Sequence, residues 1–161
     1  MTTIDPIPAG YATVTPSITI RGCSDALALY EQAFGATNES TQLHPDGRVL
    51  HATLRIGTST MMFNDEFPEF GSMESGGADD SVQSRGGSPV SFWVYVEDCD
   101  AAFERAVAAG LTEVSKPEDM FWGDRTATVL DPFGLRWTLA TRVEEVSEQE
   151  MEARTKQMFG G

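Results

Sequence analysis

The chain has 161 residues and a mass of 17.5 kDa, enough for one buried core or for two half-size modules that share one. Its 25 acidic and 11 basic side chains give a formal net charge of −14, which argues against nucleic acid and anionic membrane surfaces as partners. The sequence has no signal-peptide pattern, no membrane-spanning run and no zinc or redox spacing of its two cysteines, so we expect a cytoplasmic protein.

The first half of the chain predicts a strand, a helix and two further strands. Polar and apolar side chains alternate over residues 11–20, which is typical of a strand with one buried face. Residues 24–34 begin with a cap candidate, keep their apolar side chains on one stripe and end at Gly35, as an amphipathic helix does. Two β-rich runs follow at 48–56 and 59–64.

The second half repeats this order. We expect a strand over 90–96, a helix over 100–109, and a hairpin of 125–130 and 135–140 around an Asp-Pro-Phe-Gly turn.

Corresponding residues of the two halves are separated by nearly the same number of positions. Gly35 and Gly110, which end the two helices, are 75 positions apart, and Cys23 and Cys99 are 76 positions apart. Such a repeat predicts two similar structural units in one chain.

Two segments fall outside the repeat. Residues 66–88 are rich in glycine, serine and acidic side chains without periodicity, and we interpret them as a linker or as a flap near a pocket. The capping-box spacing that starts at Ser147 predicts a C-terminal helical tail over 147–161.

Several stretches of the sequence resemble a known family. They are Phe-Trp-Gly-Asp-Arg at 121–125, Asp-Pro-Phe-Gly-Leu-Arg-Trp at 131–137, Ala-Phe-Gly-Ala at 33–36 and Val-Tyr-Val-Glu-Asp at 94–98. With these motifs, residues 14–146 resemble the vicinal oxygen chelate (VOC) superfamily of glyoxalase, bleomycin resistance and dioxygenase type, especially its PhnB-like branch.

The resemblance implies an α+β fold in which two βαβββ modules form a curled mixed sheet around one small-molecule pocket, the glyoxalase/bleomycin resistance/dioxygenase fold. Module 1 then covers 11–65 and module 2 covers 89–146, in a single domain over 11–146. The resemblance also implies a homodimer.

In the enzymes of this family, inward His, Glu or Gln side chains hold a divalent metal that acts as a Lewis acid. The resemblance carries these positions onto Thr15 and Ser91, on the first strand of each module, and onto Met62 and Thr138, on the last. Hydroxyls and a thioether are poor ligands for such ions. We therefore expect no metal and no other cofactor.

Two histidines are present. His44 precedes a Pro-Asp-Gly turn and is interpreted as a solvated loop residue. His51 lies in a predicted strand, where it either faces the pocket or is a hydrogen-bonded structural residue.

Aromatic side chains supply the other candidates. Trp93 and Tyr95 share the strand face of Ser91, so they either line the pocket or belong to the core, while Phe92 and Val94 point the other way.

Near Trp122, Asp124 and Arg125 either form a structural ion pair or lie at the pocket mouth. Trp137 either lines the cavity or packs behind the sheet.

No catalytic residue is assigned. The candidate substrate-binding residues are Thr15, Ser17, His51, Met62, Ser91, Trp93, Tyr95, Trp122, Arg125 and Thr138.

Two functions remain open. One is a metal-free small-molecule-binding protein that sequesters a drug or metabolite, as bleomycin resistance relatives do. The other is a VOC enzyme, a glyoxalase-like lyase or isomerase or a dioxygenase, with metal-independent chemistry or a relocated divalent metal. The lost ligands favour the first, and no nucleophile–base spacing, phosphate loop or dinucleotide fingerprint supports the second.

Overall fold

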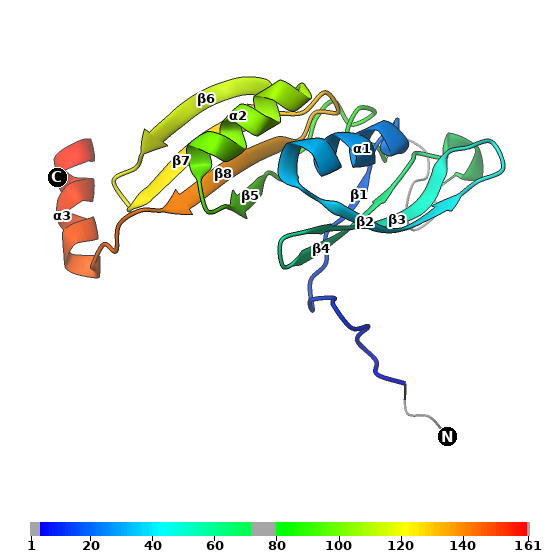
Figure 1. Ribbon diagram of the computed structural model, residues 1–161, viewed down its shortest axis with the longest axis horizontal. Coiled ribbons are helices and arrows are strands. Elements are labelled where there is room, and N and C mark those ends of the chain that lie inside the picture. Colours follow the sequence, from blue (N-terminus) through cyan, green and yellow to red (C-terminus); the bar gives the residue numbers. More distant parts are fainter. Residues whose placement is uncertain (1–3, 72–79, 161) are drawn as a thin grey trace. The chain divides into compact units, whose positions relative to one another are not determined.

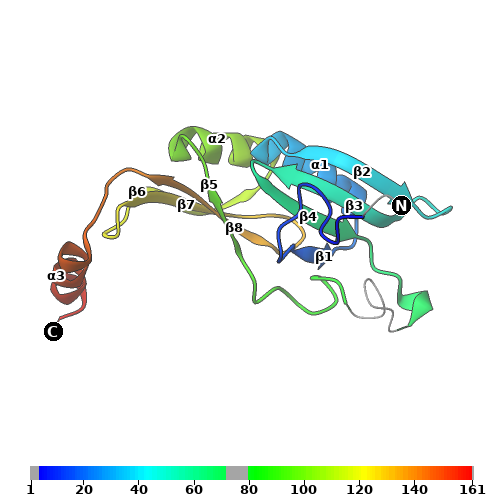
Figure 2. The same cartoon turned by 90° about the horizontal axis from the view of Figure 1, so that it is seen from below.

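The computed structural model describes residues 4–71 and 80–160, and the chain divides into two compact units, Met1–Ser88 and Pro89–Gly161. Each unit has a four-stranded mixed sheet with a helix packed against it (Figures 1 and 2). The sheets are not closed into barrels, and the architecture is α+β, as the sequence predicts. No helix in the described parts of the chain combines the length and apolar character needed to cross a bilayer.

The first unit has the strand order β1-β4-β3-β2, with β1 parallel to β4 and the other pairs antiparallel. Its elements are β1 (Ser17–Thr19), α1 (Cys23–Phe34), β2 (Thr37–Leu43), β3 (Val49–Ile56), β4 (Ser59–Asn64) and a 3-10 turn (Pro68–Phe70). The core of this unit lies between α1 and the sheet, where the ring centroids of Tyr30 and Phe63 are 5.5 Å apart and both side chains are fully buried.

The start of α1 is stabilised by a carboxylate from the other end of the unit. Gly22, rather than the expected Ser24, is the N-cap residue, and it has no side chain to accept hydrogen bonds. Asp65, directly after β4, takes the place of a capping side chain: its carboxylate accepts hydrogen bonds from the backbone N–H groups of Gly22 and Cys23 at 2.9 and 3.0 Å. Its other oxygen accepts from Val49 at 2.7 Å, so one buried side chain joins α1, β3 and β4.

The second unit has the strand order β5-β8-β7-β6, again with one parallel pair, β5 and β8. Its elements are β5 (Phe92–Tyr95), α2 (Cys99–Ala109), β6 (Thr112–Asp119), β7 (Asp124–Leu130), β8 (Arg136–Arg142) and α3 (Glu148–Phe159). Asp98 caps α2 by accepting from the N–H of Ala101 at 3.0 Å.

The core of the second unit lies between α2 and one face of this sheet. Trp137 is fully buried there, and its ring centroid is 4.7 Å from that of Phe92. Asp131 holds the turn before β8: it accepts from the backbone N–H groups of Phe133 and Leu135, and from Nε1 of Trp137, each at 2.9 Å. Trp137 therefore packs behind the sheet and does not line an open surface.

The C-terminal helix α3 starts at Ser147, whose hydroxyl accepts from the N–H of Glu150. Arg154 ties this helix to the loop before β7, because it donates to the carbonyl of Phe121 at 3.1 Å and to both carboxylate oxygens of Glu144. The ring of Phe159 contacts that of Phe121 edge-on, with the centroids 6.2 Å apart.

The prediction of one strand over residues 11–20 was wrong, since β1 covers only Ser17–Thr19. Pro16 lacks an N–H for the ladder, and Val14, assigned to the buried side, is 83% exposed.

Segment 66–88, interpreted as a linker or flap, is held to the first unit wherever it is described. The carboxylate of Glu66 accepts from the N–H of Ser81 and the hydroxyl of Ser84, and Val82 donates to the carbonyl of Thr19. Residues 72–79 of this segment lie outside the described part of the chain.

Candidate functional site

The face of the second sheet that is turned away from α2 is called the open face below. It carries Trp93 and Tyr95 of β5, Thr138 of β8, Thr128 and Asp124 of β7, and it is bordered by Trp122 from the loop before β7. Trp93 pairs in register with Thr138, and Thr138 pairs with Thr128, so these side chains stand on one side of the sheet.

The three aromatic side chains form a connected group on this face. The ring centroid of Trp93 lies 6.4 Å from that of Tyr95 and 6.4 Å from that of Trp122, and both pairs are tilted by 51°. Trp93 is 48% exposed and Tyr95 is 65% exposed, which is unusual for rings of this size. Rings that are held in place and left open offer a flat apolar surface to a ligand.

Asp124 anchors two of the three rings. One carboxylate oxygen, Oδ2, accepts from the hydroxyl of Tyr95 at 3.1 Å and from Nε1 of Trp122 at 3.2 Å. Asp124 itself is only 6% exposed. The hydrogen bond to Asp124, together with burial, raises the pKa of the Tyr95 hydroxyl, so Tyr95 remains a neutral donor at physiological pH.

Hydroxyl groups lie beside the aromatic group. The side-chain oxygens of Thr128 and Thr138 are 3.3 Å apart on neighbouring strands. One hydroxyl of such a pair donates to the other, which leaves the second one able to donate to a ligand. The open face therefore combines apolar surface with polar groups that can orient a bound molecule.

The corresponding face of the first unit is polar. Ser17 pairs in register with Met62, and Met62 pairs with Thr53. The hydroxyl of Thr53 is 3.1 Å from that of Tyr11 and 3.3 Å from Nε2 of His51, so hydroxyl, hydroxyl and imidazole form a short chain of hydrogen bonds.

Several of the sequence-predicted site residues come together and others do not. Trp93, Tyr95, Trp122 and Thr138 meet on the open face of the second unit, whereas Ser17, His51 and Met62 share a face of the first unit. Ser91 is exposed directly before β5, and Thr15 precedes β1, where its hydroxyl donates to the carbonyl of Ala12.

Arg125 lies on the opposite face from the aromatic group. Its guanidinium pairs with Asp100 of α2 at 2.6 Å and with Asp119 of β6 at 2.9 Å. The ion pair between Asp124 and Arg125, one of the two sequence interpretations, does not form. Neighbouring residues of a strand point to opposite faces, so Arg125 reaches the helix while Asp124 reaches the rings.

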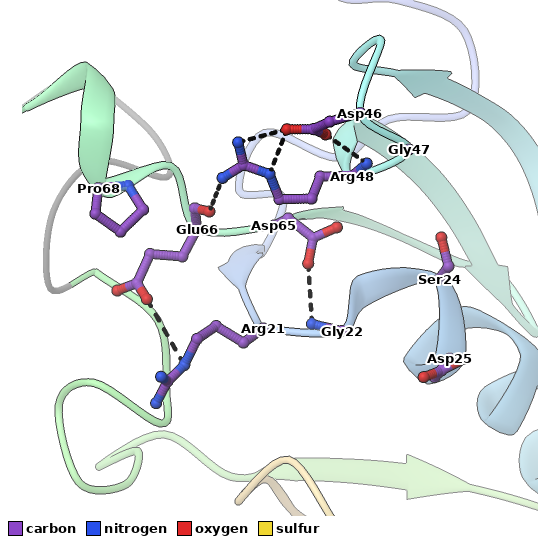
Figure 3. A pocket seen from close by; sticks show the side chains of 10 residues that line it. All are labelled: Arg21, Gly22, Ser24, Asp25, Asp46, Gly47, Arg48, Asp65, Glu66 and Pro68. Atoms are coloured by element: carbon purple, nitrogen blue, oxygen red, sulfur yellow. Dashed lines mark hydrogen bonds and ion pairs between the residues drawn. The ribbon is translucent and has the colours of Figure 1, made fainter.

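A second hollow lies at the start of α1 (Figure 3) and has a volume of about 530 Å³. Its two arginines are paired with carboxylates: Arg48 pairs with Asp46 at 2.7 Å and with the nearby Glu69, and Arg21 pairs with Glu66 at 3.7 Å. These bonds to Arg48 hold the pKa of Glu69 below its ordinary value. Both arginines of this pocket are engaged by neighbouring carboxylates, and Asp65 is bonded to backbone N–H groups, so we assign the candidate site to the open face.

Comparison with known proteins places this geometry in a family. The sequence profile of the Glyoxalase/Bleomycin resistance protein/Dioxygenase superfamily matches residues 13–139. The chain belongs to this superfamily. An uncharacterized protein of Mycobacterium bovis is 39% identical over 140 residues, which cover 87% of this chain and 90% of the relative.

Solved structures of this superfamily type have the same fold. TioX from Micromonospora sp. ML1 matches with a TM-score of 0.62 and 22% identity, over 84% of this chain and all of TioX. A PhnB protein from Bacillus cereus matches with a TM-score of 0.59 and 16% identity, over 81% of this chain and 99% of that protein.

The metal of the superfamily's enzymes does not fit the residues of this chain. The positions that the resemblance assigns to its ligands carry Thr15 and Met62 in the first unit and Ser91 and Thr138 in the second. Ser17 and Trp93, which lie in register with Met62 and Thr138, are no better donors. Among the described residues, no three His, Cys, Asp or Glu side chains are close enough to share an ion.

Proposed function

We propose that this superfamily member is a small-molecule-binding protein that holds a planar organic ligand on the open face without a metal. The observation that carries the proposal is the group of Trp93, Tyr95 and Trp122 around the carboxylate of Asp124. In this proposal, stacking on the rings supplies the affinity, and Thr128 and Thr138 set the orientation.

The residues on the open face support binding more than catalysis. The residues named on this face include no thiol or imidazole. The hydroxyl beside a carboxylate, that of Tyr95, has a pKa raised by its hydrogen bond to Asp124, which makes it a poor nucleophile or base at neutral pH.

Two further parts of the proposal rest on family resemblance and composition. We propose that the protein is a homodimer and that it works in the cytoplasm, without nucleic acid or membrane partners. The net charge of −14 supports the exclusion of polyanionic partners, because phosphate backbones and anionic lipids bind basic surfaces.

Calorimetric titration with quinoline, a planar molecule that is uncharged at neutral pH, tests ligand binding. We expect saturable binding to the wild-type protein and a loss of about tenfold or more in affinity for Trp93→Ala. Phe70→Ala is the matched control, because Phe70 is 44% exposed but belongs to the first unit. If Trp93→Ala binds quinoline as tightly as the wild type, the proposal is wrong.

A further inference from the structure

The carboxylate of Asp124 is buried and forms no ion pair with a basic side chain in the described part of the chain. Its two hydrogen-bond donors, the hydroxyl of Tyr95 and the indole N–H of Trp122, are both neutral. No arginine or lysine of the described residues forms an ion pair with it, although Asp124 is only 6% exposed. Burying an anion is costly unless a cation or several strong donors compensate for it.

The nearest cation on the sheet is directed elsewhere. Arg142 stands opposite Asp124 in the β7–β8 register, and its charge opposes the rise in the pKa of Tyr95, but its guanidinium pairs with Glu145 at 3.4 Å and its side chain is 63% exposed. The other arginine close to Asp124 in sequence, Arg125, lies on the far face and is neutralised by Asp100 and Asp119. The negative charge at the base of the rings is therefore left for a molecule that arrives from outside.

The rings around this charge are suited to a cation as well. The faces of tryptophan and tyrosine carry negative potential, and they attract a cation held within about 6 Å of the ring centre. Each hydrogen bond to Asp124 pulls on the proton of the hydroxyl or indole N–H and leaves more electron density in that ring. The ring centroid of Trp93 is 6.4 Å from those of Tyr95 and Trp122, so a compact cation can approach more than one of these rings at once.

From these two observations together we infer that the ligand of the open face is an organic cation, a planar or compact molecule with a substituted ammonium or a positively charged heteroaromatic ring. The inference rests on the proposed function, since it names the ligand class of the same site. Asp124 acts as the buried counter-charge, and Trp93, Tyr95 and Trp122 provide the contact surface. The acidic surface, with its net charge of −14, also attracts cations over longer distances.

The test compares two ligands that differ by one methyl group and a permanent positive charge. Quinoline is neutral, and N-methylquinolinium has nearly the same shape with a permanent positive charge. We expect the wild-type protein to bind N-methylquinolinium at least about tenfold more tightly than quinoline, because a desolvated cation–π contact and a nearby carboxylate both favour the charged ring. Added salt should weaken binding of the cation and leave binding of quinoline unchanged.

Asp124→Asn tests whether the preference for the cation comes from the buried charge of Asp124 or from the overall acidity of the protein. The amide oxygen of asparagine can still accept from Tyr95 and Trp122, so the rings keep their positions while the charge is lost. We expect the preference for the cation to fall by about tenfold, with quinoline binding unchanged. Asp119→Asn is the matched control, because Asp119 is 70% exposed and belongs to the ion pair on the other face. Near-ultraviolet circular dichroism checks that Asp124→Asn keeps the aromatic environment.

The outcomes are distinguishable. If quinoline binds in a Trp93-dependent way and the cation binds no more tightly, the cation inference is overturned and the proposed function stands. If neither molecule binds, both are overturned. If Asp119→Asn reduces the preference as much as Asp124→Asn does, the preference comes from overall charge, and the assignment to Asp124 is wrong. The ratio of the two wild-type affinities tests the inference even if Asp124→Asn does not fold.

Discussion

Trp93 lies in register beside Thr138, one of the positions to which the family resemblance assigns a metal ligand. In the first unit, Ser17 lies beside Met62 in the same way, with the same offset of 76 positions between the units. These four positions therefore carry two hydroxyls, an indole and a thioether, none of which is a good ligand for the divalent ions of the family's enzymes.

The first prediction concerns metal content. We expect protein purified without chelator to contain far less than one zinc, nickel, iron or manganese ion per chain, and chelator to leave its melting temperature unchanged. A bound metal stabilises only the state that binds it, so its removal would lower the melting temperature. Elemental analysis together with thermal unfolding in the presence and absence of chelator makes the measurement. One ion per chain in repeated preparations would contradict the prediction.

The second prediction concerns alkaline pH. Burial, followed by the charge of Asp65, raises the pKa of the Cys23 thiol from 9.0 to about 12. Between these pH values the folded state keeps a proton that the unfolded state has lost, so the free energy of unfolding decreases as the pH rises. This contribution is fully present below pH 9.0 and is lost as the pH approaches about 12.

Urea unfolding at a series of pH values tests this prediction. Cys23→Ala should lose less stability per pH unit than the wild type, by up to about 1 kcal/mol. Cys99→Ala should change the slope in the same direction, since burial raises the pKa of that thiol too. If the free energy of unfolding falls equally steeply with pH in the wild type and in Cys23→Ala above pH 9.0, the Cys23 thiol does not contribute to the pH dependence of stability.

The third prediction concerns the contact between α3 and the loop of Trp122. Arg154→Ala removes the bonds to the carbonyl of Phe121 and to Glu144, so we expect a loss of about 1 kcal/mol and a shift in tryptophan emission. Lys156→Ala is the control, because Lys156 pairs only with Glu152 on the same helix, and it should cost less than about 0.5 kcal/mol. An unchanged emission spectrum in Arg154→Ala would mean that α3 does not position Trp122.

The fourth prediction is that the protein is a homodimer. Its sheets are short and leave large apolar side chains such as Val114 and Leu130 exposed on the chain taken alone. Sedimentation velocity should give twice the chain mass of 17.5 kDa over a wide concentration range. A sedimenting species of one chain mass at all concentrations would rule this out.

The elements with a strong local pattern could be predicted from the sequence. Both central helices carry an apolar stripe and end at a glycine, and the alternation in β5 put Trp93 and Tyr95 on one face correctly. The strands β2 and β6 had no such signal. Both lie at a sheet edge, where nearly every side chain is exposed and no apolar alternation is required.

The part of the site that sequence reasoning missed depends on long-range contacts. Asp124 matters because Tyr95, 29 positions earlier, reaches the same oxygen as Trp122, and no spacing rule predicts that meeting. The position of Arg125 could have been found, because two adjacent strand residues cannot share a face. The hollow at the start of α1 was not expected either, since its side chains come from separate segments that only folding brings together.

The two sides of each sheet have diverged differently between the units. On the side covered by a helix, Cys23 and Cys99 hold corresponding buried positions, and Ile18 and Val94 are both aliphatic. On the uncovered side, Ser17 corresponds to Trp93 and Met62 to Thr138, which share no chemistry. Ser17 and Trp93 are exposed and Met62 and Thr138 are half-buried, so substitutions at these positions leave the helix-covered core untouched. The same scaffold can therefore acquire a new binding specificity with little loss of folding stability.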